Sequence, residues 1–349
     1  MAFRLDGASS LVSLIAEISG NHNGSIDTCK DLIKSAQICG ADYVKIQTYR
    51  PDTMTLDIDH ENFVINKSHK LWGGQSLYEL YKTAQTPWEW HQELFEFSNS
   101  LGMRIFSTPF DKTAVDLLEE LNTPIYKIAS LESGDIPLIK YIAQTQKPVI
   151  ASTGSSTLEE IDELVETIYS EGNKDLTLLL CTSAYPTPHN QVHLSRMQLL
   201  RERYNVPVGL SDHTLGNSAS LAAVAMGATV IERHFILNRG QGGPDSAFSL
   251  EPNELRDLSI HIKQIEQSVG NKLWEIQPDE SESRRLRRSL IITVDVQKGE
   301  LISDLNVKSL RPNIGISPKF YGEVIGKRFN AAFSAGTALT FDKIAELSN

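Results

Sequence analysis

Two histidines lie directly after apolar runs in the second half of the chain. His213 is part of "GLSDHT" and His234 belongs to "VIERHF". A single histidine at such a position is usually a packed core or rim residue, whereas two that reach one opening can bind a metal ion. Two imidazoles leave coordination positions for water, substrate oxygens or a carboxylate, and nitrogen ligands favour Mn, Co, Fe or Zn. The pair therefore indicates either two rim residues or a catalytic metal site.

Lysines and hydroxyl residues follow other apolar runs. Lys45 and Lys127 could bind a phosphate or carboxylate as point charges, with Ser and Thr hydroxyls as directed donors. Lys127 could instead form a Schiff base with a carbonyl substrate, as lysines do in barrel aldolases. The other polar residues at the ends of such runs are Glu17, Gln47, Thr108, Ser130, Glu132, Ser152, Ser183, Tyr185, Ser211 and Glu232.

The apolar runs that carry these residues have the length and spacing expected of buried parallel strands. They are short and rich in β-branched residues, and helix-like segments separate them. They cover residues 13–18, 43–49, 104–110, 124–130, 148–153, 176–183, 206–212 and 229–235. Eight such units over residues 13–268 match the size of a (β/α)8 TIM barrel. An open doubly wound sheet would need a glycine fingerprint for phosphate or a reversal of strand order, and neither is visible.

A barrel brings the carboxyl end of every strand to one mouth, so the polar strand ends are expected to form one site. Residues two apart along a strand share a face, and three strands end in polar pairs with this spacing. The pairs are Lys45 with Gln47, Ser211 with His213, and Glu232 with His234.

The rest of the chain divides by composition. Residues 1–270 are expected to form the barrel, with an insertion at about 51–88 that follows a strand and so lies on the catalytic face as a lid or substrate wall. The charge-patterned residues 271–289 predict a linker. Residues 290–349, with short strand signals and turns, predict a small β-rich domain.

The composition argues against large charged partners. The chain has 33 basic and 44 acidic residues, a net charge of −11, which disfavours nucleic acid and anionic membranes. It has neither an apolar run of about 18 residues nor a convincing secretory signal. Cys29, Cys39 and Cys181 lack metal-binding spacing and are expected to be reduced core thiols of a cytoplasmic protein.

Eight motifs, in order along the chain, resemble those of the sialic acid synthase family. They are "AEISGNHNGS", "VKIQTY", "STPFD", "YKIAS", "STG", "CTSAYPTP", "GLSDHT" and "IERHF". The stretches "RRSLIITVDVQKGELI" and "LRPNIGI" resemble the antifreeze-like (SAF, β-clip) domain that follows the barrel in this family. Within the family, "LWGGQSLYELYKTAQTPWEWH" and "GGPDSAFSLEP" are most similar to the pseudaminic acid synthases.

The resemblance implies roles for the polar strand ends. Phosphoenolpyruvate would be held by Lys45, Thr108, Lys127, Ser130, Ser152, Ser183 and Ser211. Many N-acetylneuraminate synthases have asparagine where this chain has Ser183. The sugar would face Glu17, Gln47, Tyr185 and Asp245, and Glu132 would lie beside the reacting carbons.

The resemblance also implies a metal and a partner subunit. His213 and His234 match the metal ligands, with Mn²⁺ as the expected ion and Mg²⁺ or Co²⁺ as alternatives. Together with Glu17 and Glu132 they would be the catalytic residues. Arg311 matches an arginine that the small domain donates to the sugar site of the other barrel in a domain-swapped homodimer.

The implied activity is condensation of phosphoenolpyruvate with 2,4-diacetamido-2,4,6-trideoxy-L-altrose to give pseudaminic acid and phosphate. Ala247 and Phe248 offer apolar surface for this sugar where neuraminate-type relatives carry a more polar stretch. N-acetylneuraminate or legionaminate synthesis is the alternative within the family. Outside it, the alternatives are a lyase that uses Lys127 covalently and a sugar-phosphate-binding protein without catalysis.

Overall fold

The computed structural model describes residues 11–68, 71–270 and 274–345. The chain divides into two compact units, Met1–Gly270 and Asn271–Asn349. Each unit is described by itself. No helix within the described ranges is both long and apolar enough to cross a membrane.

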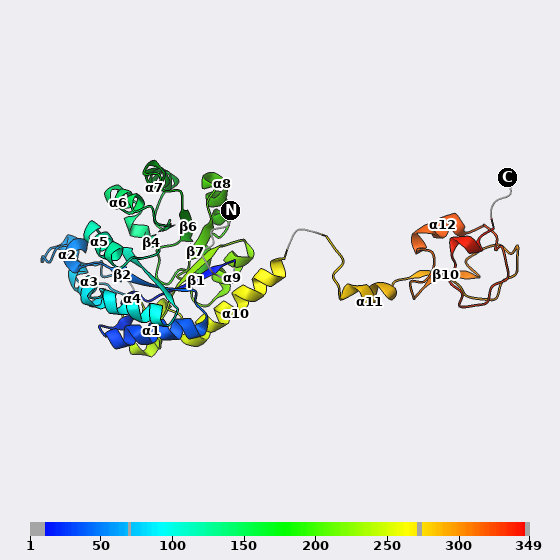
Figure 1. Cartoon of the computed structure of the whole chain (residues 1–349), viewed down its shortest axis with the longest axis horizontal. Coiled ribbons are helices and arrows are strands. Elements are labelled where there is room, and N and C mark those ends of the chain that lie inside the picture. Colours follow the sequence, from blue (N-terminus) through cyan, green and yellow to red (C-terminus); the bar gives the residue numbers. More distant parts are fainter. Residues whose placement is uncertain (1–10, 69–70, 271–273, 346–349) are drawn as a thin grey trace. The chain divides into compact units, whose positions relative to one another are not determined.

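The first unit is built on a closed barrel of eight parallel strands in chain order (Figure 1). The strands are β1 Ser13–Glu17, β2 Tyr43–Thr48, β3 Arg104–Pro109, β4 Tyr126–Ile128, β5 Val149–Ser152, β6 Leu176–Cys181, β7 Val208–Ser211 and β8 Val230–His234. β1 pairs with both β2 and β8, which closes the sheet. The predicted (β/α)8 barrel is therefore confirmed, and the open sheet is excluded because such a sheet would leave two unpaired edges.

Helices surround the strands (Figure 1). They are α1 Ile26–Cys39, α2 Pro51–Met54, α3 Leu77–Ala84, α4 His91–Ser100, α5 Lys112–Glu120, α6 Ile136–Gln144, α7 Leu158–Ser170, α8 Arg196–Tyr204, α9 Ser218–Ala225 and α10 Pro252–Val269. Local sequence fixes several ends. The Ser25 hydroxyl accepts from Thr28 N–H at the start of α1, and Gly40, with φ +88°, ends it. Thr157 and Glu160 form a reciprocal capping box at the start of α7.

Two apolar clusters make up the core of the first unit. The larger one lies between the helices and the outer faces of the strands. The smaller one consists of side chains that alternate with these along the strands and fill the barrel interior: Ile15, Tyr43, Phe106, Ile125, Ile150, Leu179 and Val230. This inner layer forms the floor beneath the carboxyl ends of the strands, where the site lies.

The insertion between β2 and β3 contains short helices and an isolated bridge. It holds α2, a 3₁₀ turn at Glu61–Phe63, α3 and a second 3₁₀ turn at Trp88–Trp90. Val64 and Ser76 form an antiparallel bridge within it.

The second unit has its own small sheet and core. β9 Ser289–Ile292 pairs antiparallel with β10 Val307–Leu310, and the short helix α12 spans Tyr321–Val324. Its buried cluster comprises Leu290, Ile292, Val296, Ile302, Val307, Ile316, Val324, Phe329 and Leu339. Within the segment expected to be a linker, residues Glu280–Arg285 form the short helix α11.

Candidate active site

A ring of mostly polar side chains lies directly above the apolar layer of the barrel. Each apolar residue of the inner layer is followed, two positions later, by a residue that faces the same way. Together with Ser211 on β7, these residues are Glu17, Lys45, Thr108, Lys127, Ser152, Cys181 and Glu232. All of them line one cavity of about 330 Å³. Alternation of side chains along the strands thus places these residues in one layer above the apolar floor of the barrel.

Charge within the ring is balanced by close ion pairs. The Lys45 ammonium contacts the Glu17 carboxylate, lies 3.9 Å from Glu232 Oε1, and donates to Thr108 Oγ1 at 3.2 Å. Burial raises the pKa of Glu17, although Lys45 acts in the opposite direction. Burial would also raise the pKa of Glu232, but the nearby Lys127 and Lys45 ammonium groups outweigh it and lower that pKa. A ligand anion would meet two lysines that two carboxylates already neutralise in part.

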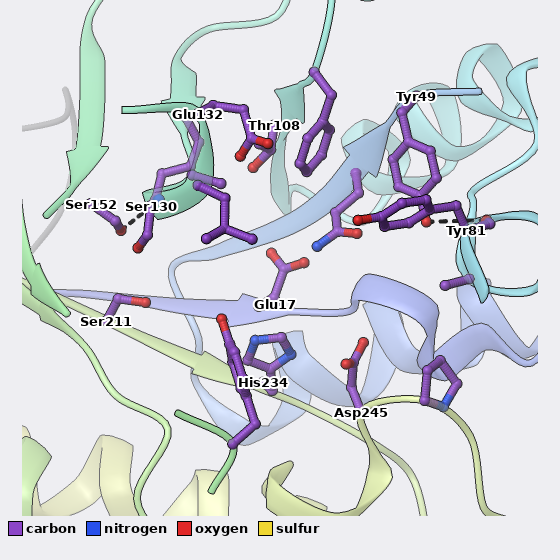
Figure 2. Close-up of a pocket in the computed structure, with 18 of the residues that line it drawn as sticks. Glu17, Tyr49, Tyr81, Thr108, Ser130, Glu132, Ser152, Ser211, His234 and Asp245 are labelled. Carbon is purple, nitrogen blue, oxygen red and sulfur yellow. Dashed lines mark hydrogen bonds between the residues drawn. The ribbon is translucent and has the colours of Figure 1, made fainter. Parts of the chain in front are cut away.

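Lys127 is held by hydrogen bonds on the opposite side of the ring. Its ammonium donates to Ser152 Oγ at 2.7 Å and to the Ile128 carbonyl at 2.9 Å. Burial lowers the pKa of Lys127. Figure 2 shows Ser130, Ser152 and Ser211 together at this end of the cavity.

Gly154 permits a close backbone approach behind this end. A Cβ at Gly154 would lie 2.4 Å from Ser183 Oγ and 2.7 Å from Ser130 Oγ, so a larger residue there would have to displace these hydroxyls. Ser183 Oγ is buried, without a hydrogen-bond partner among the described residues, and Ser183 does not line the cavity. Of the hydroxyl residues predicted to contact phosphoenolpyruvate, Ser183 is therefore the one that does not line the cavity.

The two histidines lie side by side at the mouth. The ring centroids of His213 and His234 are 5.2 Å apart. Nδ1 of His213 lies 3.2 Å from the Thr182 carbonyl, and Nδ1 of His234 lies 3.3 Å from Ser19 Oγ. Because Nδ1 is engaged on both rings, Nε2 is the nitrogen left to bind a ligand on each, as is usual in metal sites.

The histidines fit a metal ion that keeps open positions. The described residues contain no group of three or more His, Cys, Asp and Glu arranged to hold a metal. Two protein nitrogens would leave the remaining positions to water or substrate oxygens, which is the arrangement of a catalytic metal centre. Burial lowers the pKa of His234 well below its usual range, so this ring is neutral, as a metal ligand must be, whereas the neighbouring Cys181 outweighs burial and raises the pKa of His213.

Two further carboxyl groups have raised pKa values. Burial raises the pKa of Glu132 to about 7, with Lys127 acting against it. Burial raises the pKa of Asp245 to about 6, although Asp245 Oδ2 accepts a 3.3 Å hydrogen bond from Gly20 N–H. Carboxyl groups with pKa values near neutrality can exchange protons at working pH.

The insertion forms the opposite wall of the cavity. Its side chains there are mostly apolar: Met54, Ile65, Trp72, Leu77, Leu80, Tyr81 and Ala84. Tyr49, directly after β2, and Tyr81 lie together, away from Ser152 and Ser211 (Figure 2). Trp72 Nε1 donates to the Pro244 carbonyl at 2.9 Å, and its ring lies 5.9 Å from Tyr185. The insertion is thus tied to the loop that carries Asp245.

The cavity brings together most of the residues predicted for the site. The predicted residues that line it are Glu17, Lys45, Gln47, Thr108, Lys127, Ser130, Glu132, Ser152, Tyr185, Ser211, His213, His234 and Asp245. Arg311 lies in the second unit. Two residues of the ring, Glu232 and Cys181, were not assigned a role from the sequence, although Glu232 was recognised as a polar strand end and alternation along β6 places Cys181 in the ring. Cys181 is not simply a core thiol, since it lines the cavity and accepts a 3.3 Å hydrogen bond from Ser130.

Comparison with known protein families gives two matches on this chain. Residues 32–273 match the NeuB family, and residues 287–345 match the SAF domain. The two matches fall on the barrel and on the small β-rich unit.

Individual relatives cover nearly the whole chain. The pseudaminic acid synthase of Helicobacter pylori is 43% identical over 332 residues, which cover 95% of this chain and 97% of that protein. The N,N'-diacetyllegionaminic acid synthase of Campylobacter jejuni is 38% identical over 324 residues, covering 90% of this chain and 94% of that protein. The crystal structure of an N-acetylneuraminic acid synthetase from Leptospira borgpetersenii is 32% identical with a TM-score of 0.69, covering 78% of this chain and 90% of that chain.

Proposed function

Because this chain belongs to the NeuB family, we propose that it is a pseudaminic acid synthase, which condenses phosphoenolpyruvate with 2,4-diacetamido-2,4,6-trideoxy-L-altrose. The family match confirms the resemblance drawn from the sequence motifs. The observation that carries the proposal is one cavity that combines a lysine- and hydroxyl-rich end, two imidazoles and an apolar wall.

The lysine-rich end suits phosphoenolpyruvate, which carries both a phosphate and a carboxylate. Lys45 and Lys127 supply charge, and the neighbouring hydroxyls supply directed donors. The hydroxyls are those of Thr108, Ser130, Ser152 and Ser211. Since these contacts exist before and after the reaction, they mainly orient C3 of the enol toward the sugar.

Nε2 of His213 and Nε2 of His234 would hold a divalent cation. We propose Mn²⁺, with Mg²⁺ or Co²⁺ as alternatives, because water and substrate oxygens at the open positions suit Mn and the family resemblance implies this ion. When bound, the ion would supply Lewis-acid polarisation of the C1 aldehyde of the open-chain sugar. The two imidazoles are fixed by hydrogen bonds at Nδ1, so they present Nε2 without rotation.

Glu17 and Glu132 are suited to act on the charge that develops and the proton that moves during the reaction. C3 of phosphoenolpyruvate attacks C1 of the sugar, and C2 becomes a cationic, oxocarbenium-like centre. Water then adds to C2, and phosphate leaves by C–O cleavage. Glu17, already paired with Lys45, is suited to stabilise the cation as a fixed charge. Glu132, with a pKa of about 7, is suited to take the proton of the attacking water.

The apolar wall suits a deoxygenated, doubly acetylated sugar. The proposed substrate has a methyl at C6 and two acetamido methyls, which apolar side chains such as Ile65, Leu77 and Leu80 would cover. Gln47, Tyr185 and Asp245 remain as polar partners in the lining of the same cavity.

The proposal includes a homodimer and a cytoplasmic location. As the family resemblance implies, Arg311 of the small domain would reach the sugar site of the partner subunit's barrel. Nucleic acid and membrane are not expected as partners, given the net charge of −11.

Phosphate release from phosphoenolpyruvate tests the function. With Mn²⁺ present, we expect rapid release with 2,4-diacetamido-2,4,6-trideoxy-L-altrose and slow release with N-acetylmannosamine. Equal or faster release with N-acetylmannosamine would contradict the sugar assignment but keep the synthase. No release with any amino sugar and any of the three cations would contradict the synthase itself.

A further inference from the structure

Ser19 has a backbone conformation that normally favours glycine. Its φ is +46°, in the left-handed region, which a residue with a Cβ rarely adopts. The residue lies two positions after Glu17, and only 1% of its surface is exposed. Since glycine would adopt this conformation at lower cost, the backbone does not explain why the position carries a side chain. The hydroxyl group is what remains to be explained.

Three polar groups surround that hydroxyl. Ser19 Oγ contacts the Glu17 carboxylate at Oε1. Gln47 Nε2 donates to Ser19 Oγ at 3.2 Å, and His234 Nδ1 lies 3.3 Å away. The hydroxyl therefore joins a proposed catalytic carboxylate, a proposed sugar ligand and a proposed metal ligand.

Counting donors and acceptors fixes the state of the histidine. A hydroxyl has one hydrogen to donate and two lone pairs that accept. The Ser19 hydroxyl donates its hydrogen to Glu17 Oε1, while the other oxygen of Glu17 faces the Lys45 ammonium. The Gln47 amide occupies one lone pair. The remaining lone pair requires His234 Nδ1 to carry a hydrogen, which leaves the lone pair of the ring on Nε2.

The second imidazole reaches the same state by a different route. His213 Nδ1 faces the Thr182 carbonyl, and a carbonyl can only accept, so this Nδ1 also carries the hydrogen. Backbone fixes the tautomer of one ring, and a single side chain fixes that of the other. Only the side-chain link, from Ser19 to His234, can be removed by substitution.

We propose that Ser19 is a positioning residue that holds His234 in the Nδ1–H tautomer, so that Nε2 of His234 is available to a divalent cation. The inference rests on the metal role in the proposed function. Ser19 itself does not contact the cation; it acts through His234, and it links that ring to Glu17 and Gln47.

The test compares two serine-to-glycine variants of the full-length protein. Ser19→Gly removes the hydroxyl and relieves the backbone. Ser155→Gly is the matched control, because Ser155 also has positive φ, +58°, but its side chain is exposed. Mn²⁺ affinity is measured from the electron paramagnetic resonance signal of free Mn²⁺. The His234 tautomer is read, in metal-free protein, from ¹⁵N shifts of the ring nitrogens, assigned with His234→Ala.

For Ser19→Gly we expect Mn²⁺ affinity to fall by about 10- to 100-fold, the usual effect of losing the partner of a ligand histidine. We also expect His234 to lose its single Nδ1–H state, while the melting temperature stays within a few degrees of wild type. Ser155→Gly should match wild type in both readouts. A general structural defect would lower the melting temperature without changing the tautomer.

Two results would overturn the inference. One is a wild-type Mn²⁺ affinity in Ser19→Gly; the other is an unchanged His234 tautomer in that variant. If wild-type protein binds no divalent cation yet releases phosphate from phosphoenolpyruvate, this inference fails while the synthase assignment stands. If it binds Mn²⁺ through His234 but condenses no sugar, the synthase assignment fails and the Ser19 inference stands.

Discussion

Glu17 and His234 are register partners across the strand pair β1–β8 that closes the barrel. The side chain of Ser19 contacts both of them. A carboxylate and a neutral imidazole thus share one hydrogen-bonded contact at the mouth, and β2 adds Lys45 on the other side of Glu17. Charge that develops on a substrate at this point would be felt by all three groups, because the interior of the cavity screens weakly.

Removal of either histidine should abolish turnover without unfolding the barrel. In His213→Ala or His234→Ala we expect phosphate release to fall by at least about 100-fold, since half of the proposed protein ligands are lost. Both rings lie at the mouth above the apolar layer, so circular dichroism and the melting temperature should stay close to wild type. EDTA should inactivate the wild-type enzyme, and Mn²⁺ should restore it. Full activity in EDTA or in either variant would contradict the metal assignment.

Glu132 predicts a pH dependence of both rate and stability. Its pKa is raised by burial to about 7. If the carboxylate takes the proton of the attacking water, kcat/KM should rise with pH through about 7 and then level off. Glu132→Gln should lose this limb and most of its activity. A wild-type profile that is flat between pH 6 and pH 8 would argue against this role.

The stability effect of Glu132 has a definite sign. The folded protein binds the proton of Glu132 more tightly than the unfolded chain, so its contribution to stability is full below the unfolded pKa near 4.5 and is lost as pH rises through about 7. Glu132→Gln has no carboxyl group to ionise, so the variant does not lose this stability as pH rises. Relative to wild type, the variant should therefore gain at most about 3 kcal/mol between pH 4 and pH 8, measured by urea unfolding.

Alternation along strands explains why so much of the site could be predicted. Once eight strands are assumed to form a barrel, residues that end them and residues two positions apart must converge. Lys45 with Gln47 and Ser211 with His213 do line one cavity. The same rule extends to Glu232, which shares a strand face with His234, and to Cys181, whose thiol was expected to be a core group.

What the sequence did not predict depends on loops and hydrogen bonds. Ser183 lies two residues beyond Cys181, yet its hydroxyl is buried beside Gly154, because the chain leaves the strand direction after β6. Ser19 showed no signal in the sequence, because its role depends on a positive φ and on which groups it contacts. Tyr49 and Tyr81 meet only through the path of the insertion, which strand periodicity does not determine.

Lys127 should bind phosphoenolpyruvate without forming a covalent bond. Its low pKa would suit a Schiff base, but its ammonium already donates to Ser152 and to a backbone carbonyl. We expect Lys127→Ala to raise KM for phosphoenolpyruvate by about 100-fold, as for loss of a charged hydrogen-bond donor. Borohydride treatment with pyruvate should leave the wild-type mass unchanged. A reduced pyruvate adduct on Lys127 would support the lyase alternative.

Substitution of Trp72 should raise KM for the sugar more than KM for phosphoenolpyruvate. Its indole donates to Pro244, next to Asp245, and its ring lies beside Tyr185. Trp72→Ala would separate the insertion from this loop, so we expect KM for the sugar to rise by about 10-fold, which corresponds to about 1.4 kcal/mol. Trp72→Phe, which keeps an aromatic ring but loses the hydrogen bond, should show a smaller rise. A change confined to KM for phosphoenolpyruvate would contradict the position of the sugar.

Arg311 should act in the partner's site of a homodimer. It is exposed on its own unit, just beyond β10, and so is available to a group outside that unit. Arg311→Ala and His213→Ala should each be nearly inactive alone. In a mixed dimer, the barrel with an intact His213 would receive Arg311 from the other chain, so one complete site forms. Equal mixing should restore about a quarter of wild-type activity, because about half of the dimers are mixed and each has one working site. If isotope-labelled subunits exchange and activity does not return, Arg311 does not act across the dimer.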